Sequence, residues 1–167
     1  MTRNRDERLA EVAAIAVRIE AEAGVPAAML VAQWAIESRW GTKPTGNSNY
    51  FGIKRAKRHA KYCAVTTREV VDGKDEMRVC EFADYESLEA SCHDYAWLIT
   101  HGAPYRKAWQ QYRMDGDRSD LITAVARAYA TDPQYGRLAV SIAGQANVDA
   151  AIQAAKVAHD LARELQR

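Results

Sequence analysis

Apolar residues recur at helical spacing near the start of the chain. The positions concerned are Leu9, Val12, Ala13, Ala16, Ile19 and Ala23. Steps of three and four residues place them on one face, which predicts an amphipathic helix over residues 6–23. Gly24 is suited to end this helix, and Pro26 to open a second one that ends near Ser38. Two consecutive helices are therefore expected to begin the fold.

A different pattern, typical of strands, covers residues 62–82. β-branched residues dominate the stretch 65–71, and apolar residues return at intervals after it. Between the two runs, Asp72 and Gly73 form a strong hairpin-turn signal. The pattern predicts one β-hairpin, inserted after the second helix.

Helical spacing returns after residue 86. It predicts helices over 87–99, 104–111 and 121–129, a fourth that ends at Gly144, and a last one over about 147–165. Ser119 or Asp120 is expected to cap the third of these, and Thr131 or Asp132 the fourth. The predicted fold class is α+β and mainly helical, in one domain of 167 residues. A helical lobe would face a small β-hairpin lobe across a groove, which is a lysozyme-like design.

Composition narrows the functions open to this domain. The formal net charge of +1 at pH 7 provides no global field for nucleic acid, so no nucleic-acid partner is expected. No stretch has the apolar length of a membrane span. The charged first seven residues lack the apolar region of a secretory signal. We therefore expect a protein made in the cytoplasm without a signal peptide.

The three cysteines are Cys63, Cys80 and Cys92, and none belongs to a Cys-x-x-Cys pair. This spacing argues against a zinc site, and we expect neither a metal nor another cofactor. The odd count argues against a dedicated disulfide framework and favours thiols made in a reducing compartment. A disulfide between Cys63 and Cys80 stays open if the two lie on paired strands.

Six basic residues crowd the stretch 54–61, directly after an apolar motif. They are Lys54, Arg55, Lys57, Arg58, His59 and Lys61. The simpler interpretation of this run is a solvated loop. The alternative is a local attraction for an anionic polymer, such as a cell-wall glycan or its peptide carboxylates.

The end of the second predicted helix places a carboxylate among apolar neighbours. Leu30, Gln33 and Trp34 precede Glu37 by seven, four and three residues, so they share its helix face. Partial burial and the negative end of the helix dipole both raise the pKa of such a carboxyl group. A raised pKa suits a general acid that works near neutral pH. The alternative is a plain ion pair with Arg39 or a distant basic residue at the surface.

Five short motifs occur in an order that resembles one enzyme family. They are AIESRWG at 35–41, NYFGIK at 49–54, TTREVVDG at 66–73, FADYES at 82–87 and YATDPQY at 129–135. Together they resemble the glucosaminidases of glycoside hydrolase family 73, which includes flagellar muramidase-like domains, autolysins and phage lysins. The resemblance covers roughly residues 27–138. Two departures are Arg39, where the family usually has Gly, and Ala83, where it usually has Arg.

The resemblance implies a reaction and the residues that carry it out. The substrate would be the β-1,4 bond between N-acetylglucosamine and N-acetylmuramic acid in peptidoglycan. The family's catalytic acid falls on Glu37, its second carboxylate on Glu69, and its substrate-positioning tyrosine on Tyr129. Glu69 would activate water and give inversion, or the substrate's own acetamido group would attack instead. The sequence leaves both routes open.

Further aromatic and polar residues of the motifs are candidates for contact with sugar rings or for shaping the groove. They are Trp40, Asn49, Phe51, Asp132 and Tyr135. For the aromatic ones, packing in the core is the alternative. The last predicted helix, over residues 145–167, lies largely outside the resemblance and is expected to be an addition to the single catalytic domain.

Three other functions fit parts of the same pattern. A lytic transglycosylase or a lysozyme-type muramidase would share the groove and a Glu at the end of a helix, and a wall-binding module would keep the fold without turnover. The retention of Glu37, Glu69 and Tyr129 together favours a hydrolase. The expected partner is the glycan strand of peptidoglycan, approached by a monomer. A phage lysin, a virion-associated enzyme or a fragment of a secreted protein would each fit.

Overall fold

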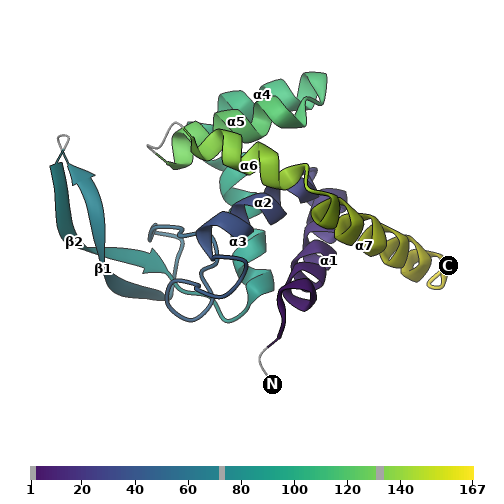
Figure 1. Ribbon diagram of the computed structural model, residues 1–167, viewed down its shortest axis with the longest axis horizontal. Coiled ribbons are helices and arrows are strands. Elements are labelled where there is room, and N and C mark those ends of the chain that lie inside the picture. The colour runs from purple at the N-terminus through teal and green to yellow at the C-terminus, as the bar shows by residue number, and fades with distance from the viewer. Residues whose placement is uncertain (1–2, 72–73, 131–133) are drawn as a thin grey trace.

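The computed structural model describes residues 3–71, 74–130 and 134–167, and most of them are helical (Figure 1). The helices are α1 (Arg5–Ala23), α2 (Ala27–Glu37), α3 (Leu88–His101), a 3₁₀ turn (Ala103–Tyr105), α4 (Arg106–Asp115), α5 (Arg118–Tyr129), α6 (Tyr135–Ala143) and α7 (Ala146–Glu164). The strands are β1 (Tyr62–Val71) and β2 (Lys74–Ala83). The predicted fold class and the position of the hairpin are confirmed. Within these residues, none of the helices combines the length and apolarity needed to cross a bilayer.

Helix α2 lies in the middle of the helical body (Figure 1). All of its residues from 27 to 35 are buried, as expected of a helix that is apolar on every side. Helices α1, α3, α6 and α7 pack around it. Its last residue, Glu37, is therefore held at the edge of the hydrophobic core.

The ends of α1 follow the sequence closely. The side chain of Asn4 accepts a hydrogen bond from the backbone N–H of Glu7, and the side chain of Glu7 accepts one from Asn4, each at 2.9 Å. This reciprocal cap explains why the helix begins at Arg5 rather than one residue later. Gly24 ends the helix in the left-handed conformation with φ 75°, as predicted.

The cap of α5 differs from the prediction. The carboxylate of Asp117 accepts hydrogen bonds from the backbone N–H groups of Ser119 at 2.9 Å and Asp120 at 3.0 Å. Ser119 and Asp120, the predicted caps, instead lie in the first turn of the helix. The predicted caps of α6, Thr131 and Asp132, lie outside the described residues.

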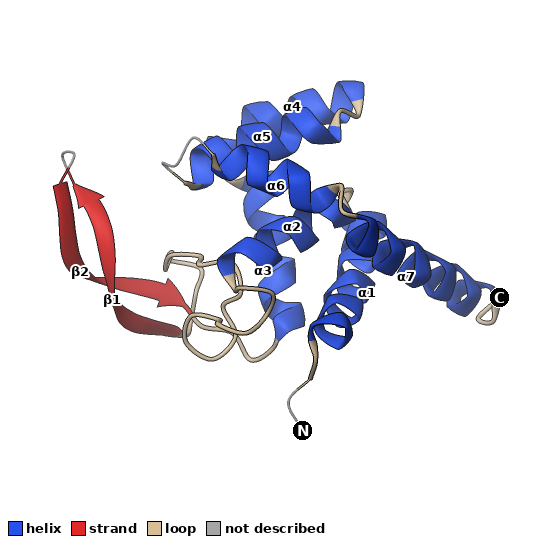
Figure 2. Cartoon of the chain, in the orientation of Figure 1, coloured by secondary structure: helices blue, strands red, loops and turns tan. Residues whose placement is uncertain are grey.

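The two strands form an antiparallel hairpin that projects from the helical body (Figure 2). Their register runs from Tyr62 opposite Ala83 to Val71 opposite Lys74, and the predicted turn at residues 72–73 lies outside the described residues. Cys63 lies opposite Phe82 and Cys80 opposite Val65, so the two cysteines are offset by two positions. All three cysteines are thiols, and the disulfide between Cys63 and Cys80 is not formed.

Candidate active site

A tight turn directs the chain away from Glu37 at the end of α2. The buried hydroxyl of Ser38 donates to the carbonyl of Trp34 at 2.6 Å and accepts from the N–H of Gly41 at 2.8 Å. Between these anchors, Arg39 and Trp40 adopt positive φ angles of 50° and 59°. A glycine would adopt this backbone at less cost. The family that the sequence resembles usually has Gly where this chain has Arg39. The positive φ at this position explains that preference.

A chain of side-chain hydrogen bonds ends on the carboxylate of Glu37. The hydroxyl of Tyr95 donates to Oε1 of the fully buried Gln33. Nε2 of Gln33 donates to the hydroxyl oxygen of Tyr135 at 3.2 Å, and that hydroxyl donates to Oε1 of Glu37. Because the oxygen of Tyr135 already accepts a hydrogen bond from Gln33, its own proton points to Glu37. No ion pair to Glu37 is present in the described part of the chain, so the phenol is its polar anchor there.

Burial raises the pKa of the Glu37 carboxyl group above its ordinary value. The hydrogen bond from Tyr135 acts in the opposite sense, because it favours the ionised form, but burial is the larger effect. The direction agrees with the expectation from the sequence. Burial and the nearby charge of Glu37 raise the pKa of Tyr105 and Tyr129 as well. These phenols therefore remain protonated donors at neutral pH.

The loop that follows residue 48 closes over the second oxygen of Glu37. Gly52 has φ +62°, and a Cβ atom added there would lie 3.5 Å from Oε2 of Glu37. The hydroxyl of Tyr129 donates to the carbonyl of Phe51 and ties α5 to this loop. The ring of Phe51 stacks on Tyr95, with centroids 4.4 Å apart. Glycine at position 52 thus leaves space beside the carboxylate that a side chain would enter.

Two predicted sugar contacts are instead part of the core. Phe51 is completely buried, and Asn49 exposes only 1% of its surface. Nδ2 of Asn49 donates to the carbonyls of Ile53 at 2.9 Å and Ala83 at 2.8 Å, and its Oδ1 accepts from the N–H of Ile53 at 3.1 Å. These bonds join the loop to the base of the hairpin. Neither residue has exposed surface for a sugar ring, which corrects the prediction that they contact substrate.

The other predicted residues lie in different places. Trp40 packs on the α1 side, under the guanidinium of Arg5 at 3.6 Å from the ring centroid. Glu69 lies in β1 opposite Glu76, near the far end of the hairpin, which stands away from α2 (Figure 1). Asp132 lies outside the described residues. Of the predicted set, the structure brings Tyr129 and Tyr135 to the vicinity of Glu37.

A pocket of about 380 Å³ opens next to this cluster. Its lining includes Gly52, Ile53, Lys54, Arg58, Tyr105 and Tyr129. Tyr105 and Tyr129 also respond to the charge of Glu37, so the pocket adjoins the carboxylate. Two tyrosines, Tyr105 buried and Tyr129 partly buried, and a basic rim are features suited to a sugar with polar substituents.

Two residues of the basic run 54–61, Arg58 and His59, are held by a hydrogen-bond network, whereas the other basic residues of the run are exposed. Nε and Nη2 of Arg58 donate to the two carboxylate oxygens of Asp94, at 3.0 and 3.1 Å. Tyr85 donates to the same carboxylate at 2.6 Å, and His59 lies 3.0 Å from it. Because Nδ1 of His59 accepts from a backbone N–H, its Nε2 carries the proton that faces Asp94. This network holds Arg58 at the rim of the pocket.

Sequence reasoning missed the inner part of the site, Gln33 and Tyr95. Gln33 offered a signal, since it is a polar residue on a buried helix face, four positions before Glu37. Buried polar side chains are normally hydrogen-bonded, so a partner was to be expected. Tyr95 offered none, because its position fits the apolar face of α3.

Comparison with known proteins identifies the family. The sequence profile of the glucosaminidases, described as mannosyl-glycoprotein endo-beta-N-acetylglucosaminidase, matches residues 13–148. The chain belongs to the glucosaminidase family. This confirms the resemblance to glycoside hydrolase family 73 read from the five motifs. The matched range runs from within α1 to the start of α7 and leaves most of α7 outside.

Two sequence relatives differ in name, and one solved structure shares the fold. Peptidoglycan hydrolase FlgJ of Pseudomonas aeruginosa is 35% identical over 164 residues, which cover 93% of this chain and 40% of that protein. A probable N-acetylmuramidase of Lactococcus lactis is 28% identical, over 88% of this chain and 35% of that protein. The catalytic domain of the autolysin Auto of Listeria monocytogenes has the same fold, with a TM-score of 0.75, 23% identity, and coverage of 90% and 89%. The chain thus spans less than half the length of these two sequence relatives.

A matched pair of glycine variants tests the close approach of the loop to Glu37. Gly52→Ala and Gly116→Ala both place a side chain at positive φ, and each should cost about 1–2 kcal/mol of stability. Only the methyl group at position 52 lies near Glu37, whereas that at 116 meets nothing within 4 Å. We expect kcat/KM on peptidoglycan to fall about tenfold in Gly52→Ala and to stay unchanged in Gly116→Ala. Equal activity of the two variants would contradict the assigned position of the loop.

Proposed function

We propose that this glucosaminidase domain is an endo-β-N-acetylglucosaminidase that hydrolyses the glycan strands of peptidoglycan, with Glu37 as the general acid. One observation carries the proposal. A half-buried carboxyl group of raised pKa lies at the edge of the core, receives a hydrogen bond from Tyr135, and adjoins a pocket lined by tyrosines. Family membership and the name of the Pseudomonas relative support peptidoglycan as the substrate.

The two oxygens of Glu37 have different roles in this proposal. Oε1 accepts the hydrogen bond from Tyr135, so the acidic proton resides on Oε2, on the side of Gly52. From there it is donated to the glycosidic oxygen as the bond to the leaving sugar breaks. The carboxylate that forms keeps the hydrogen bond from Tyr135. Because this bond is stronger to an ionised acceptor, it stabilises the charge that develops in the transition state.

On the opposite face of the sugar, we propose Glu69 as the residue that assists water. In inverting glycosidases the two carboxyl groups lie roughly 6.5–9.5 Å apart. The far part of the hairpin stands away from α2 (Figure 1), so this role requires the hairpin to move toward the groove when substrate binds. The substrate's acetamido group is the alternative nucleophile and needs no second carboxylate.

The identity of the new sugar end tests the reaction. Mass spectrometry of peptidoglycan digested by the protein should find reducing N-acetylglucosamine ends. A reducing N-acetylmuramic acid end would indicate a muramidase, as in the name of the Lactococcus relative, and an anhydro-muramic end would indicate a lytic transglycosylase. Either outcome would contradict the proposed bond. Absence of any new end would favour a wall-binding module.

The oligomeric state and the route to the wall are parts of the same proposal. We propose a monomer, which size-exclusion chromatography with light scattering would test by giving a mass near 18.6 kDa. We also propose that it acts as a phage lysin, a virion-associated enzyme or part of a larger secreted protein. The neighbouring genes distinguish these settings, since phage structural or lysis genes would accompany the first two.

A further inference from the structure

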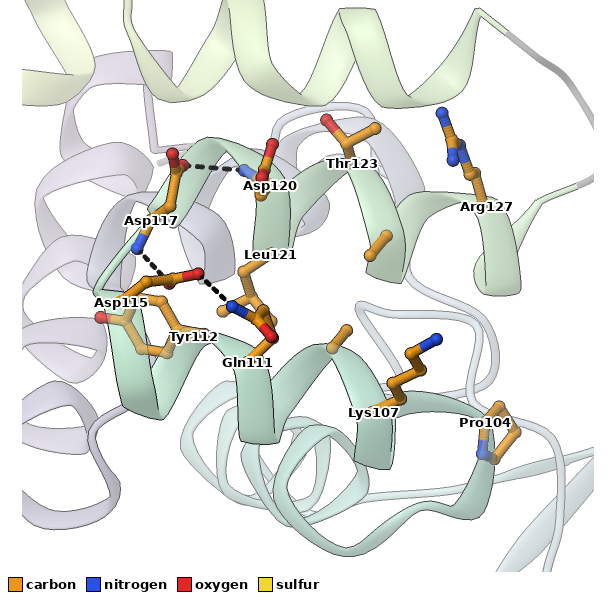
Figure 3. Close-up of a pocket in the computed structure, with 12 residues that line it drawn as sticks. Pro104, Lys107, Gln111, Tyr112, Asp115, Asp117, Asp120, Leu121, Thr123 and Arg127 are labelled. Atoms are coloured by element: carbon orange, nitrogen blue, oxygen red, sulfur yellow. Dashed lines mark hydrogen bonds between the residues drawn. The ribbon is translucent and has the colours of Figure 1, made fainter.

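A second cavity, of about 490 Å³, lies in the groove between α4 and α5 (Figure 3). Its floor is formed by Leu121, which is buried, and by the small side chains of Ala108 and Ala124. These lie below the more exposed polar residues along the two helices. The cavity is separate from the pocket beside Glu37 and has no part in the hydrogen-bond chain that ends there.

The walls of this groove carry opposite charges at its two ends. Lys107 lies near the start of α4 and Arg127 near the end of α5, and Figure 3 shows both at one end. Asp115, the last residue of α4, and Asp120, in the first turn of α5, line the other end. Eight residues of helix separate Lys107 from Asp115, which corresponds to about 12 Å.

The charged side chains at the two ends of the groove differ in their contacts with the rest of the protein. Lys107, Arg127 and Asp120 make no side-chain hydrogen bond or ion pair with the other described residues. Asp115 is held in place by Nε2 of Gln111 at 2.7 Å and by a backbone N–H at 2.8 Å. These bonds lower the pKa of Asp115 and keep it ionised. The groove therefore presents charges of both signs to a ligand.

The cationic end adjoins the proposed sugar pocket. Pro104 and Arg127 line the groove. Their neighbours in the chain, Tyr105 and Ala128, line the pocket next to Glu37. A substituent that extends from a bound sugar into the groove would reach Lys107 and Arg127 first. It would reach Asp115 and Asp120 last.

We propose that the α4–α5 groove binds the peptide branch of peptidoglycan, an inference that rests on the proposed function. This branch begins at the muramic acid, carries a free carboxylate early along its length, and carries the free amino group of a diamino acid later. The carboxylate would bind Lys107 and Arg127, and the ammonium group would bind Asp115 and Asp120. In L-Ala–γ-D-Glu–L-Lys the carboxylate and the ammonium group belong to neighbouring residues, but the γ-linkage and the long lysine side chain place about eleven bonds between them, which reach roughly 12–14 Å when extended. The order of charges in the peptide matches the order in the groove.

Kinetics on two substrates test this assignment. Glycan strands that bear peptides and strands stripped of peptides by an amidase are compared as substrates for the double variant Lys107→Ala, Arg127→Ala. We expect KM to rise about three- to tenfold on the peptide-bearing strands, as suits two exposed charge contacts, and to stay unchanged on the stripped strands. The control is Arg163→Ala, Arg167→Ala, which removes the same charge at the exposed end of α7 and should leave both KM values unchanged.

A binding experiment separates this inference from the proposed function. The tripeptide L-Ala–γ-D-Glu–L-Lys is titrated into the wild-type protein and the double variant, with the backbone amide resonances of α4 and α5 as the readout. Saturable shifts in the wild type that are lost in the variant would support the groove, whether or not the protein cleaves glycan. No binding to the wild type, or equal KM changes on both glycan substrates, would overturn it. Failure of the wild type to cleave either substrate would overturn the proposed function alone.

Discussion

Glu37→Gln is expected to abolish turnover of peptidoglycan while the protein stays folded. Gln is nearly isosteric with Glu and keeps an oxygen for the hydrogen bond from Tyr135, but it cannot donate an acidic proton. Loss of a general acid typically lowers the rate by about 10²–10⁴-fold. We expect a fall in kcat of this order, measured by release of reducing ends from glycan strands.

The same variant should not be less stable than the wild type at pH 7. The folded-state pKa of Glu37 is raised, so its contribution to stability is complete below the unfolded-state pKa and is lost as the pH rises through the folded-state value. At neutral pH, Gln avoids this loss, and the melting temperature should stay equal or rise. Glu22→Gln, at an exposed position in α1, is the control and should retain full activity. Full activity of Glu37→Gln would rule out its role as the acid.

Glu69→Gln carries the second large expected effect. If Glu69 assists water, its neutral amide should lower kcat by about ten- to hundredfold, less than the loss at Glu37. KM should change little, because the variant removes a proton acceptor rather than a binding surface. Initial rates on intact peptidoglycan measure both quantities.

The cross-strand neighbour of Glu69 supplies its control. Glu76 lies directly opposite in the hairpin register and is exposed, so Glu76→Gln removes the same charge at the same distance from the hairpin end. It should leave turnover unchanged. A wild-type rate in Glu69→Gln together with a reduced rate in Glu76→Gln or Asp72→Asn would show that the second carboxylate is assigned to the wrong residue. A wild-type rate in all three would favour attack by the substrate's acetamido group.

The sequence predicted the features that local rules govern. The spacing of apolar residues located α1 and α2 and placed Glu37 at a helix end, and the motifs indicated the family. The hairpin was predictable because β-branched residues flank a strong turn signal. The cap of α5 was missed because Asp117, Ser119 and Asp120 are all good caps within four positions, and only the backbone geometry distinguishes them.

Features that join distant parts of the chain were not predictable from local pattern. The hydrogen-bond chain to Glu37 links Gln33 to residues 62 and 102 positions away. The buried Asn49 looked like a polar groove residue, yet the backbone of its own loop and of β2 occupies its side chain. Arg58 belongs to a run interpreted from the sequence as a solvated loop, but its guanidinium donates to Asp94 of α3. In each case the partner is brought into place by tertiary packing.

The central claim is that Glu37 is the catalytic acid and that Tyr135 modulates its pKa. The pH dependence of kcat/KM tests it most directly, because the alkaline limb reports the pKa of the acid in the free enzyme. In the wild type this limb should lie above the ordinary range of a glutamate, since burial raises the pKa of Glu37. Tyr135→Phe removes a hydrogen bond that lowers this pKa, so the account predicts that the alkaline limb moves to higher pH. A limb that stays in place or moves to lower pH in Tyr135→Phe would contradict it.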